Sequence, residues 1–251
     1  MVIDYPTGAQ EARLRRLWHL AFGDSEEFIA GFFARAYSPR RCRCAAENGN
    51  VAAALYWFDA EFRGQKFAYL YAVATHPEFR NRGLCRALMT DTAVCLTERG
   101  YDGALLMPQD VGLREMYARM GFRDCCTVSE FSCGAGEAVD VRPVSEAEFA
   151  RLRREYLPPE GVIQEGANLS YLSSYAALYA GADFLLAAAP DGDSLAGMEL
   201  LGNTGAAPGI LGALEFPRGR FRTPGTTLPG AMFRPLRAGV DAPGYFGLVF
   251  D

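Results

Sequence analysis

The stretch HPEFRNRGLCRALM, residues 76–89, decides how the rest of this sequence is interpreted. It follows a run of strand-forming residues, KFAYLYAVAT at 66–75, and it leads into an apolar, helix-forming segment. The first turn of a helix has backbone N–H groups without intrahelical partners, and the helix dipole adds positive potential there. The stretch therefore predicts an anion-binding turn. Three arginines and one glycine stand at this turn: Arg80, Arg82, Arg86 and Gly83.

Phosphate is the anion that these residue types favour. Arginine side chains offer bidentate donors for phosphate oxygens, and Gly83 lets the backbone approach a phosphate without a side chain in the way. We therefore expect residues 81–86 to cradle a pyrophosphate. The chain has no GxxxxGK[ST] motif and no GxGxxG at this turn, which excludes a P-loop and a dinucleotide site. On charge alone, a solvated basic turn with a capping glycine remains the alternative.

Composition narrows the class of protein. Of the 251 residues, 50% are hydrophobic and 22% are charged, and the formal net charge is −5. This balance is typical of a globular protein with a buried core, and the acidic excess argues against nucleic-acid binding. With seven cysteines, two of them adjacent, and only two histidines, we expect reduced thiols and no metal site. No apolar run reaches the ~20 residues of a membrane helix, and no apolar leader opens the sequence, so we expect a cytoplasmic protein without membrane partners.

The hydrophobic pattern predicts one α/β unit that ends near residue 133. Apolar residues at helical spacing indicate helices, and runs of aromatic and aliphatic residues between turn signals indicate strands. The first three strands are close together, so we expect an antiparallel meander. Residues 133–138, CGAGEA, are typical of a linker. The expected helices are 9–22, a segment from Ser25, 84–98 and 111–120, and the expected strands are 42–46, 51–58, 66–75, 103–108 and 122–131.

The second half of the chain opens like the first. Each half starts with a strand-like segment, a proline and a helix that contains ARLRR, at 12–16 and at 150–154. We therefore favour a duplicated fold with domains at 1–133 and 134–251, although a match of five residues can arise by chance. In the second half we expect a helix at 168–180 and strands at 184–190, 194–202, 210–216 and 245–250.

Two motifs resemble those of a known family. Residues 80–85 read R-x-x-G-x-C and follow VATHPEF at a strand end, and residues 117–122 read YARMGF. Together they resemble the acetyl-CoA signature of the GNAT superfamily of N-acetyltransferases, [QR]-x-x-G-x-[GA], and the family's Y-x-x-x-G-F. The resemblance covers about residues 1–131. It implies an α/β (α+β) acyl-CoA N-acyltransferase fold in tandem, with residues 134–251 as a degenerate second copy.

The arrangement is similar to that of tandem-domain relatives resembling the enhanced intracellular survival (Eis) acetyltransferases. Those proteins add a sterol-carrier-like domain, which we expect this chain to lack. Two residues depart from the family pattern: Cys85 stands where most members have Gly or Ala, and Asp110 where many have Asn. The nearest second-half match to the signature, residues 222–225, contains a proline, which has no N–H to offer a phosphate. We therefore expect no second cradle.

The resemblance implies a role for each site residue. Acetyl-CoA is the expected co-substrate, without a metal. A main-chain N–H of the strand would stabilise the oxyanion, a contribution of about 3–4 kcal/mol. Tyr117 would protonate the departing thiolate as general acid, a role worth about 10²–10⁴-fold in rate. The expected binding residues are Val73, Ala74, Thr75, Arg80, Asn81, Arg82, Gly83, Leu84, Cys85 and Arg86.

The predicted reaction transfers an acetyl group to a primary amine of a small molecule or peptide. An alkylamine has a pKa of about 10, so it must lose a proton before it attacks. Glu130, Glu61, water and the terminal carboxylate of Asp251 stay open as the base. The alternative function is a non-catalytic acyl-CoA-binding or sensing protein, and an RNA-dependent aminoacyl-transfer enzyme is disfavoured by the acidic composition. The sequence leaves open whether the chain forms a homo-oligomer.

Overall fold

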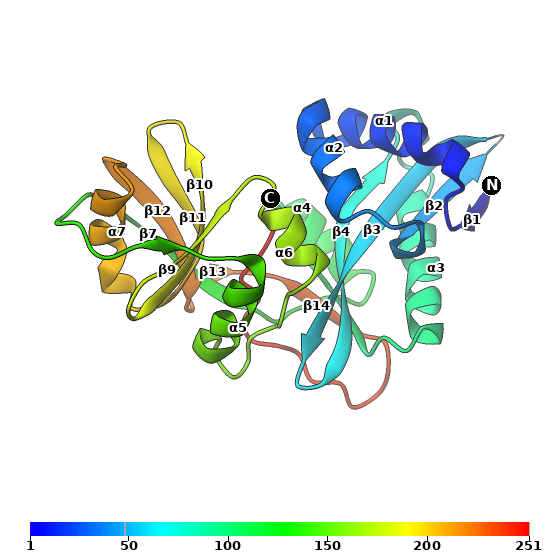
Figure 1. The fold of residues 1–251 in the computed structure, drawn as a ribbon. Coiled ribbons are helices and arrows are strands. Elements are labelled where there is room, and N and C mark those ends of the chain that lie inside the picture. Colours follow the sequence, from blue (N-terminus) through cyan, green and yellow to red (C-terminus); the bar gives the residue numbers. More distant parts are fainter. Residues whose placement is uncertain (48, 251) are drawn as a thin grey trace. The chain divides into compact units, whose positions relative to one another are not determined.

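A computed structural model describes residues 1–47 and 49–250, which form two compact units. Unit 1 comprises Met1–Arg123 and Phe233–Asp241, and unit 2 comprises Asp124–Met232 and Ala242–Asp251. Each unit contains a seven-stranded sheet with helices against it (Figure 1). The division therefore falls earlier than the expected boundary after residue 133, and it is discontinuous, because the chain returns to unit 1 late in the sequence.

Unit 1 is built on a mixed sheet with the strand order β1-β2-β3-β4-β5-β14-β6. The antiparallel pairing of β2, β3 and β4 confirms the expected meander, and β4 pairs with β5 in parallel. The strands are β1 (Val2–Asp4), β2 (Cys42–Glu47), β3 (Asn50–Phe62), β4 (Gln65–Thr75), β5 (Gly103–Leu106), β6 (Arg123–Asp124) and β14 (Met232–Pro235).

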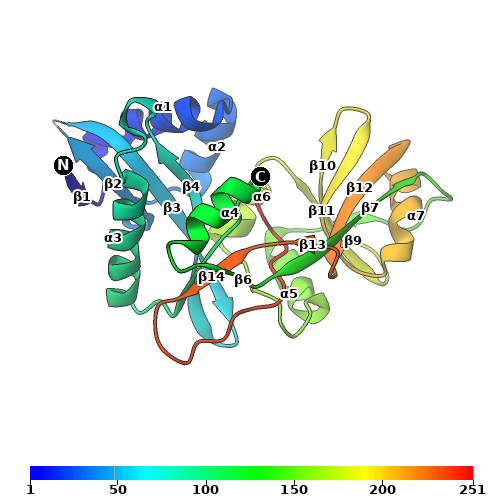
Figure 2. The ribbon, with the colours of Figure 1, turned by 180° about the vertical axis from the view of Figure 1, so that it is seen from behind.

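Helices cover both faces of this sheet. Trp18 and Phe32, on the first two helices, pack against Tyr56 with ring centroids 5.4 and 5.0 Å apart. The next residue, Trp57, lies on the opposite face, under the Arg99 guanidinium that ends α3. Figures 1 and 2 accordingly show α1 and α2 on one face and α3 along the other. The helices are α1 (Glu11–Phe22), α2 (Glu26–Arg35), α3 (Leu84–Glu98) and α4 (Val111–Ala118), with short turns of 3-10 helix at Gly8–Gln10, Pro39–Arg41 and Pro77–Phe79.

Strand β14 comes from late in the sequence. It is hydrogen-bonded between β5 and β6, and Figure 2 shows it beside β6. Phe233 of this strand is fully buried and stacks on Phe67, with ring centroids 5.3 Å apart. Just beyond the strand, the Leu236 N–H donates to the Asp102 carbonyl at 2.9 Å. Unit 1 is thus completed by a strand that the chain reaches only after it has passed through unit 2.

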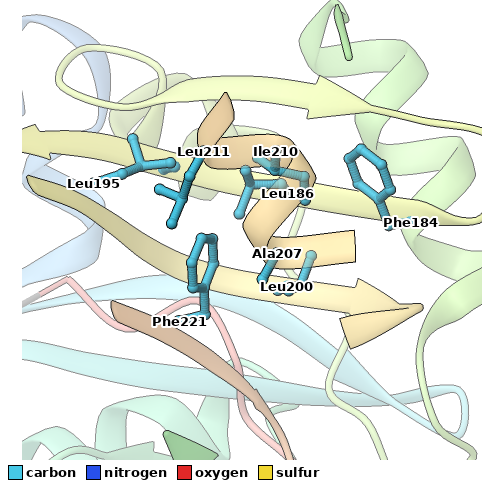
Figure 3. Close-up of a cluster of buried hydrophobic side chains, with 9 residues drawn as sticks. Phe184, Leu186, Leu195, Leu200, Ala207, Ile210, Leu211 and Phe221 are labelled. Atoms are coloured by element: carbon cyan, nitrogen blue, oxygen red, sulfur yellow. The ribbon is translucent and has the colours of Figure 1, made fainter. Parts of the chain in front are cut away.

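Unit 2 has the sheet order β8-β9-β10-β11-β12-β7-β13. On one face, α7 and the sheet enclose a cluster of buried aliphatic and aromatic side chains that includes Leu186, Ile210 and Phe221 (Figure 3). The strands are β7 (Thr127–Gly134), β8 (Arg142–Pro143), β9 (Ala177–Ala180), β10 (Phe184–Asp191), β11 (Ser194–Gly202), β12 (Arg218–Pro224) and β13 (Leu228–Pro229). The helices are α5 (Glu146–Tyr156), α6 (Ala167–Leu172) and α7 (Ala207–Ala213), with a 3-10 turn at Thr204–Ala206.

The two sheets have the same connectivity. In each, an edge strand and an antiparallel meander lead through a helix to a parallel strand: β4–α3–β5 in unit 1 and β11–α7–β12 in unit 2. In each, the next strand comes from another part of the sequence, β14 in unit 1 and β7 in unit 2. The two copies of ARLRR lie on the corresponding helices α1 and α5. This equivalence supports the duplication that the repeated pentapeptide suggests.

Two predictions for the second half were wrong. The apolar segment 210–216, expected as a strand, lies largely in helix α7, which has Pro208 in its first turn. Proline suits that position because an N–H there would have no intrahelical acceptor. The helix expected at 168–180 ends after Leu172, and the chain then forms strand β9.

The predicted strands 122–131 and 245–250 also differ from the structure. The first is interrupted, because β6 ends at Asp124 in one sheet and β7 begins at Thr127 in the other. The second contains only an isolated bridge between Gly161 and Tyr245. Side chains hold this last segment instead: the Gln164 amide donates to the Leu248 carbonyl at 2.5 Å and accepts from the Leu248 N–H at 3.1 Å.

Candidate active site

Strand β4 parts from β5 at its carboxyl end. The two strands pair from Phe67 to Tyr69, whereas β4 continues to Thr75 without further pairing to β5 among the described residues. The β3–β4 register shifts because β4 has one extra residue opposite Leu55, and Ala72 there has a φ of 47°. A β-bulge of this kind bends its strand. The bulge therefore accounts for the open edge of β4.

Val73 and Thr75 direct their main-chain groups to this open edge. The His76 N–H donates to the Ala52 carbonyl on β3 at 2.8 Å. Main-chain N–H and C=O groups alternate in direction along a strand of an antiparallel pair. Those of residue 75 therefore point away from β3, those of residue 74 point toward it, and those of residue 73 point away. The Thr75 carbonyl, on the open side, accepts a hydrogen bond from Arg80 Nε at 3.3 Å. Of the three strand residues predicted to bind the donor, Ala74 is the one whose main chain faces β3.

The turn after β4 presents backbone amides at the start of α3. Gly83 is the N-cap, with a left-handed φ of 75°, and no side chain caps the helix. The N–H groups of Leu84, Cys85 and Arg86 therefore lie in the first turn without intrahelical acceptors. That turn contains no acidic residue, and all three arginines of the motif are exposed. The turn combines backbone donors with positive charge, which is what an anion requires.

Two rings hold the shape of this turn. His76 Nδ1 accepts a hydrogen bond from the Glu78 N–H at 3.3 Å, and the His76 ring packs edge-on against Phe79 at 5.7 Å. The Arg82 guanidinium lies over Phe79, 5.2 Å from the ring centroid. These contacts give His76 a structural role in the turn and hold Arg82 near the start of α3.

Tyr117 lies buried on α4, with 7% of its surface exposed. Its ring packs edge-to-face against Phe122, with centroids 6.0 Å apart. Burial raises the pKa of Tyr117 above its ordinary value, and the nearby Cys85 thiol raises it further. The hydroxyl therefore keeps its proton at neutral pH, as a general acid must. Because Cys85 lies in the first turn of α3, its proximity to Tyr117 brings the two sequence motifs together in space.

Asp110, where many relatives have Asn, serves as the N-cap of α4. Its carboxylate accepts a hydrogen bond from the Leu113 N–H at 2.7 Å. The side chain is thus engaged at the start of the helix that carries Tyr117.

The candidate bases lie in different places. Glu61 is opposite Lys66 at the hairpin end of β3, far along the sheet from Thr75. Glu130 belongs to unit 2, where it pairs with Arg222 at 3.0 Å. Asp251 lies outside the described residues. Glu61 therefore lies away from the open end of β4, and Glu130 belongs to the other unit, so the base stays open between water, Glu130 and the terminal carboxylate.

Unit 2 has parting strands but a different turn. β11 pairs with β12 only from Ser194 to Gly197, and β11 also contains a bulge. The turn between β11 and α7 corresponds to residues 76–83, and it contains no arginine. There the Asn203 side chain accepts from the Gly205 N–H at 3.0 Å, and Pro208 removes a donor from the first turn of α7. The nearest sequence match to the signature, residues 222–225, lies at the end of β12 and not at this turn.

The remaining predictions from the sequence concern metal ligands, membrane helices and cysteines in the described part of the chain. Within it, no group of three His, Cys, Asp or Glu side chains could hold a metal ion, and no helix is long and apolar enough to cross a membrane. All seven cysteines are free thiols, and Cys125 and Cys126 have their sulfur atoms 3.2 Å apart.

The first half of the chain is similar in sequence to a known family. Residues 3–125 match the family described as acetyltransferase (GNAT) domain. The fold is the GNAT fold. No protein with a curated description matches the sequence significantly.

Solved structures of GNAT proteins resemble most of the chain, across both units. A GCN5-related N-acetyltransferase from Kribbella flavida matches 94% of this chain and 72% of its own, at 16% identity and a TM-score of 0.70. Eis1 from Mycobacterium abscessus matches 94% of this chain and 74% of its own, at 11% identity and a TM-score of 0.68. A tandem GNAT protein from the clavulanic acid biosynthesis pathway matches 95% of this chain and 100% of its own, at 11% identity and a TM-score of 0.58.

Proposed function

We propose that this chain is an N-acetyltransferase that uses acetyl-CoA and has its donor site in unit 1. The observation that carries the proposal is the open edge of β4 next to the uncapped start of α3. Coenzyme A has an extended arm with amide groups, followed by a pyrophosphate. The open edge offers main-chain groups with which such an arm can pair as an added strand does. The amides and arginines of residues 80–86 suit the pyrophosphate.

The same geometry supports a direct transfer. The neutral amine attacks the thioester carbonyl and forms a C–N bond, and the negative charge on the oxygen is stabilised by a main-chain N–H of β4, for which Val73 is the candidate. Collapse of this intermediate breaks the C–S bond. The thiolate takes its proton from Tyr117, whose raised pKa keeps that proton available at neutral pH. The attacking nitrogen loses one proton to water or to one of the remaining candidate bases, and a proton from solvent restores the Tyr117 hydroxyl.

We further propose that the chain is of the Eis-like tandem type, with a degenerate second copy. The similarity to all of a tandem GNAT protein and to most of Eis1 supports this assignment. The turn before α7, which has no arginine and has a proline in the first helical turn, supports the loss of the second cradle. The acceptor remains a primary amine of a small molecule or a peptide, and a cytoplasmic location remains a prediction.

Two measurements on the full chain test the proposal. Calorimetric titration with acetyl-CoA and with CoA measures donor binding, and an assay of thiol release over a panel of amines measures turnover. We expect micromolar binding and turnover with at least one amine. Tyr117→Phe should keep the binding and lower turnover by about 10²–10⁴-fold. Tyr5→Phe is the matched control, because it removes a hydroxyl from a 37% exposed tyrosine of the same unit.

The outcomes separate the two candidate functions. Acetyl-CoA binding without turnover on any amine, together with an unchanged affinity in Tyr117→Phe, would favour the non-catalytic acyl-CoA-binding protein. Absence of binding would refute both and would leave the arginines of the turn as a solvated basic patch.

A further inference from the structure

We propose that unit 2 has a ligand site of its own, which takes a small carboxylate with an apolar body. The site is a pocket of about 230 Å³ on the sheet of unit 2. Strands β7, β10, β11 and β12 all contribute to its lining. The proposal rests on this unit alone and does not depend on catalysis in unit 1. The side chains that decide its chemistry are Glu130, Tyr175, Met198, Arg220, Arg222 and Val249.

The pocket lies where β11 and β12 part. Ala196 and Gly197, which line it, are the last residues of β11 that pair with β12. The next residue, Met198, is the extra residue of the β11 bulge. Ala72 has the corresponding place in the β4 bulge of unit 1. Unit 2 therefore has a pocket at the place that corresponds to the reacting end of the donor site, but its turn lacks the groups that would hold a pyrophosphate.

The charge of the pocket favours an anion. Arg220 and Arg222 point to the same side of β12, because they are two residues apart on a strand. Glu130 Oε1 accepts from Arg222 Nε at 3.0 Å, and its other oxygen lies 3.6 Å from Arg220. The lining side chains thus carry two positive charges and one negative charge. An ammonium group would meet two guanidinium groups, whereas a carboxylate matches the planar fork of a guanidinium.

Burial and pairing distinguish the two arginines of the pocket. The side chains of Glu130 and Arg222 are 20% and 18% exposed, so solvent screens them less than it screens the 64% exposed Arg220. Arg220 pairs with Glu130 only at 3.6 Å, a separation that is too long for a good hydrogen bond. Arg220 is therefore the guanidinium best placed to turn toward an entering carboxylate.

The remaining lining sets the size and character of the ligand. Met198 and Val249 supply apolar walls, and Ala189, Ala196 and Gly197 leave the floor open because their side chains are small or missing. A volume of 230 Å³ corresponds to roughly seven or eight water-sized groups. A branched aliphatic acid of about that many non-hydrogen atoms fits this description, and isovalerate is a convenient probe.

The test compares three probes that share one isobutyl body. Isovalerate carries a carboxylate, isovaleramide is neutral, and isobutylamine carries an ammonium group. Each is titrated calorimetrically into the full chain. We expect isovalerate to bind and the other two to bind at least about tenfold more weakly, since charge-assisted hydrogen bonds are the stronger ones.

Two exposed arginines on the same strand provide the variant and its control. Arg220→Gln should weaken isovalerate binding about tenfold or more. Arg218→Gln removes an equally exposed arginine, which pairs with Asp193 at 2.7 Å and does not line the pocket. Its affinity for isovalerate should be unchanged. Because both side chains are largely exposed, both variants should fold.

Three results would overturn the proposal. The first is no binding of isovalerate to the unmodified chain. The second is binding of isobutylamine as tight as that of isovalerate, which would mean that Glu130 sets the charge of the pocket. The third is an equal loss of affinity in Arg218→Gln and Arg220→Gln, which would indicate general attraction to the positive strand. None of these results depends on acetyltransferase activity. The carboxylate site of unit 2 and the acetyltransferase function of unit 1 can therefore be refuted independently.

Discussion

Phe233→Ala should destabilise unit 1, although Phe233 is more than a hundred residues away in sequence from the rest of that unit's sheet. The ring is fully buried and stacks on Phe67 at 5.3 Å. Gly103 on β5 lies so close to the ring that any side chain at that position would collide with it. The Arg123 guanidinium lies over the ring as well, 5.8 Å from its centroid. Truncation would therefore leave a cavity with walls from three strands.

The expected loss is about 3–5 kcal/mol, the usual cost of truncating a buried phenylalanine to alanine. Tryptophan fluorescence during urea unfolding measures this loss in unit 1 alone, because the only two tryptophans, Trp18 and Trp57, belong to it. With a denaturant dependence of about 1–3 kcal/mol per molar urea, the midpoint should fall by roughly 1–5 M.

Phe221→Ala is the matched control. Phe221 is also fully buried on a strand, and it stacks on Phe131 at 5.6 Å in unit 2. If the two units unfold separately, this variant should leave the tryptophan midpoint nearly unchanged. If they unfold together, it should shift the midpoint as well. In either case the assignment of β14 to unit 1 is wrong if Phe233→Ala leaves the tryptophan midpoint where it was.

Three further predictions concern backbone, charge and pH. Gly83→Ala and Gly23→Ala each place a methyl group at a left-handed position, with φ of 75° and 77° and no atom beyond the adjacent residues within 4 Å. Each variant should lower Tm by about 2–4 °C, because a side chain strains that backbone conformation. Only Gly83→Ala should weaken acetyl-CoA binding in a titration. Arg153→Met leaves the buried Glu199 carboxylate without the guanidinium that bonds it at 2.6 and 2.9 Å. Chemical denaturation should therefore show a loss of about 3–5 kcal/mol in the free energy of unfolding, and most of it should be recovered when Glu199→Leu is added. Burial raises the pKa of Cys44 to about 11. The thiol therefore contributes stability that is fully present below its unfolded pKa and is lost as the pH rises toward 11. Urea midpoints measured over a pH series should fall above about pH 9, and they should fall less in Cys44→Ala.

Sequence reasoning succeeded where the signal is local. Ser25 was expected to start a helix, and its hydroxyl accepts from the Phe28 N–H at 3.2 Å. The helix expected at 84–98 has these bounds in the structure, and Gly100 just beyond it has a left-handed φ of 77°. The arginine turn between β4 and α3 was predicted from the same kind of evidence. Each of these features depends on a few neighbouring residues, which is why a single sequence can reveal it.

It failed where long-range pairing decides the structure. Met232–Pro235 is a four-residue strand that ends in proline, and nothing in those residues says that they belong beside Gly103–Leu106. The bulge at Ala72 has no sequence signal either, because alanine is not a residue that favours positive φ. The apolar segment 210–216 was assigned to the wrong element because a short apolar run has no clear period.

The exchange of β7 and β14 between the two halves also sets an order of events on the ribosome. Strand β7 is synthesised before the rest of unit 2, so that sheet can close as soon as β12 and β13 have emerged. Unit 1 has to wait for β14 while roughly 110 further residues are made, which takes about 5–20 s at common rates of translation. Throughout that interval the nascent chain carries an unpaired β5 edge, a template for wrong partners. The sheet of unit 1, which carries the arginine turn, thus stays incomplete until β14 has been made, and a chain terminated before that strand cannot complete it.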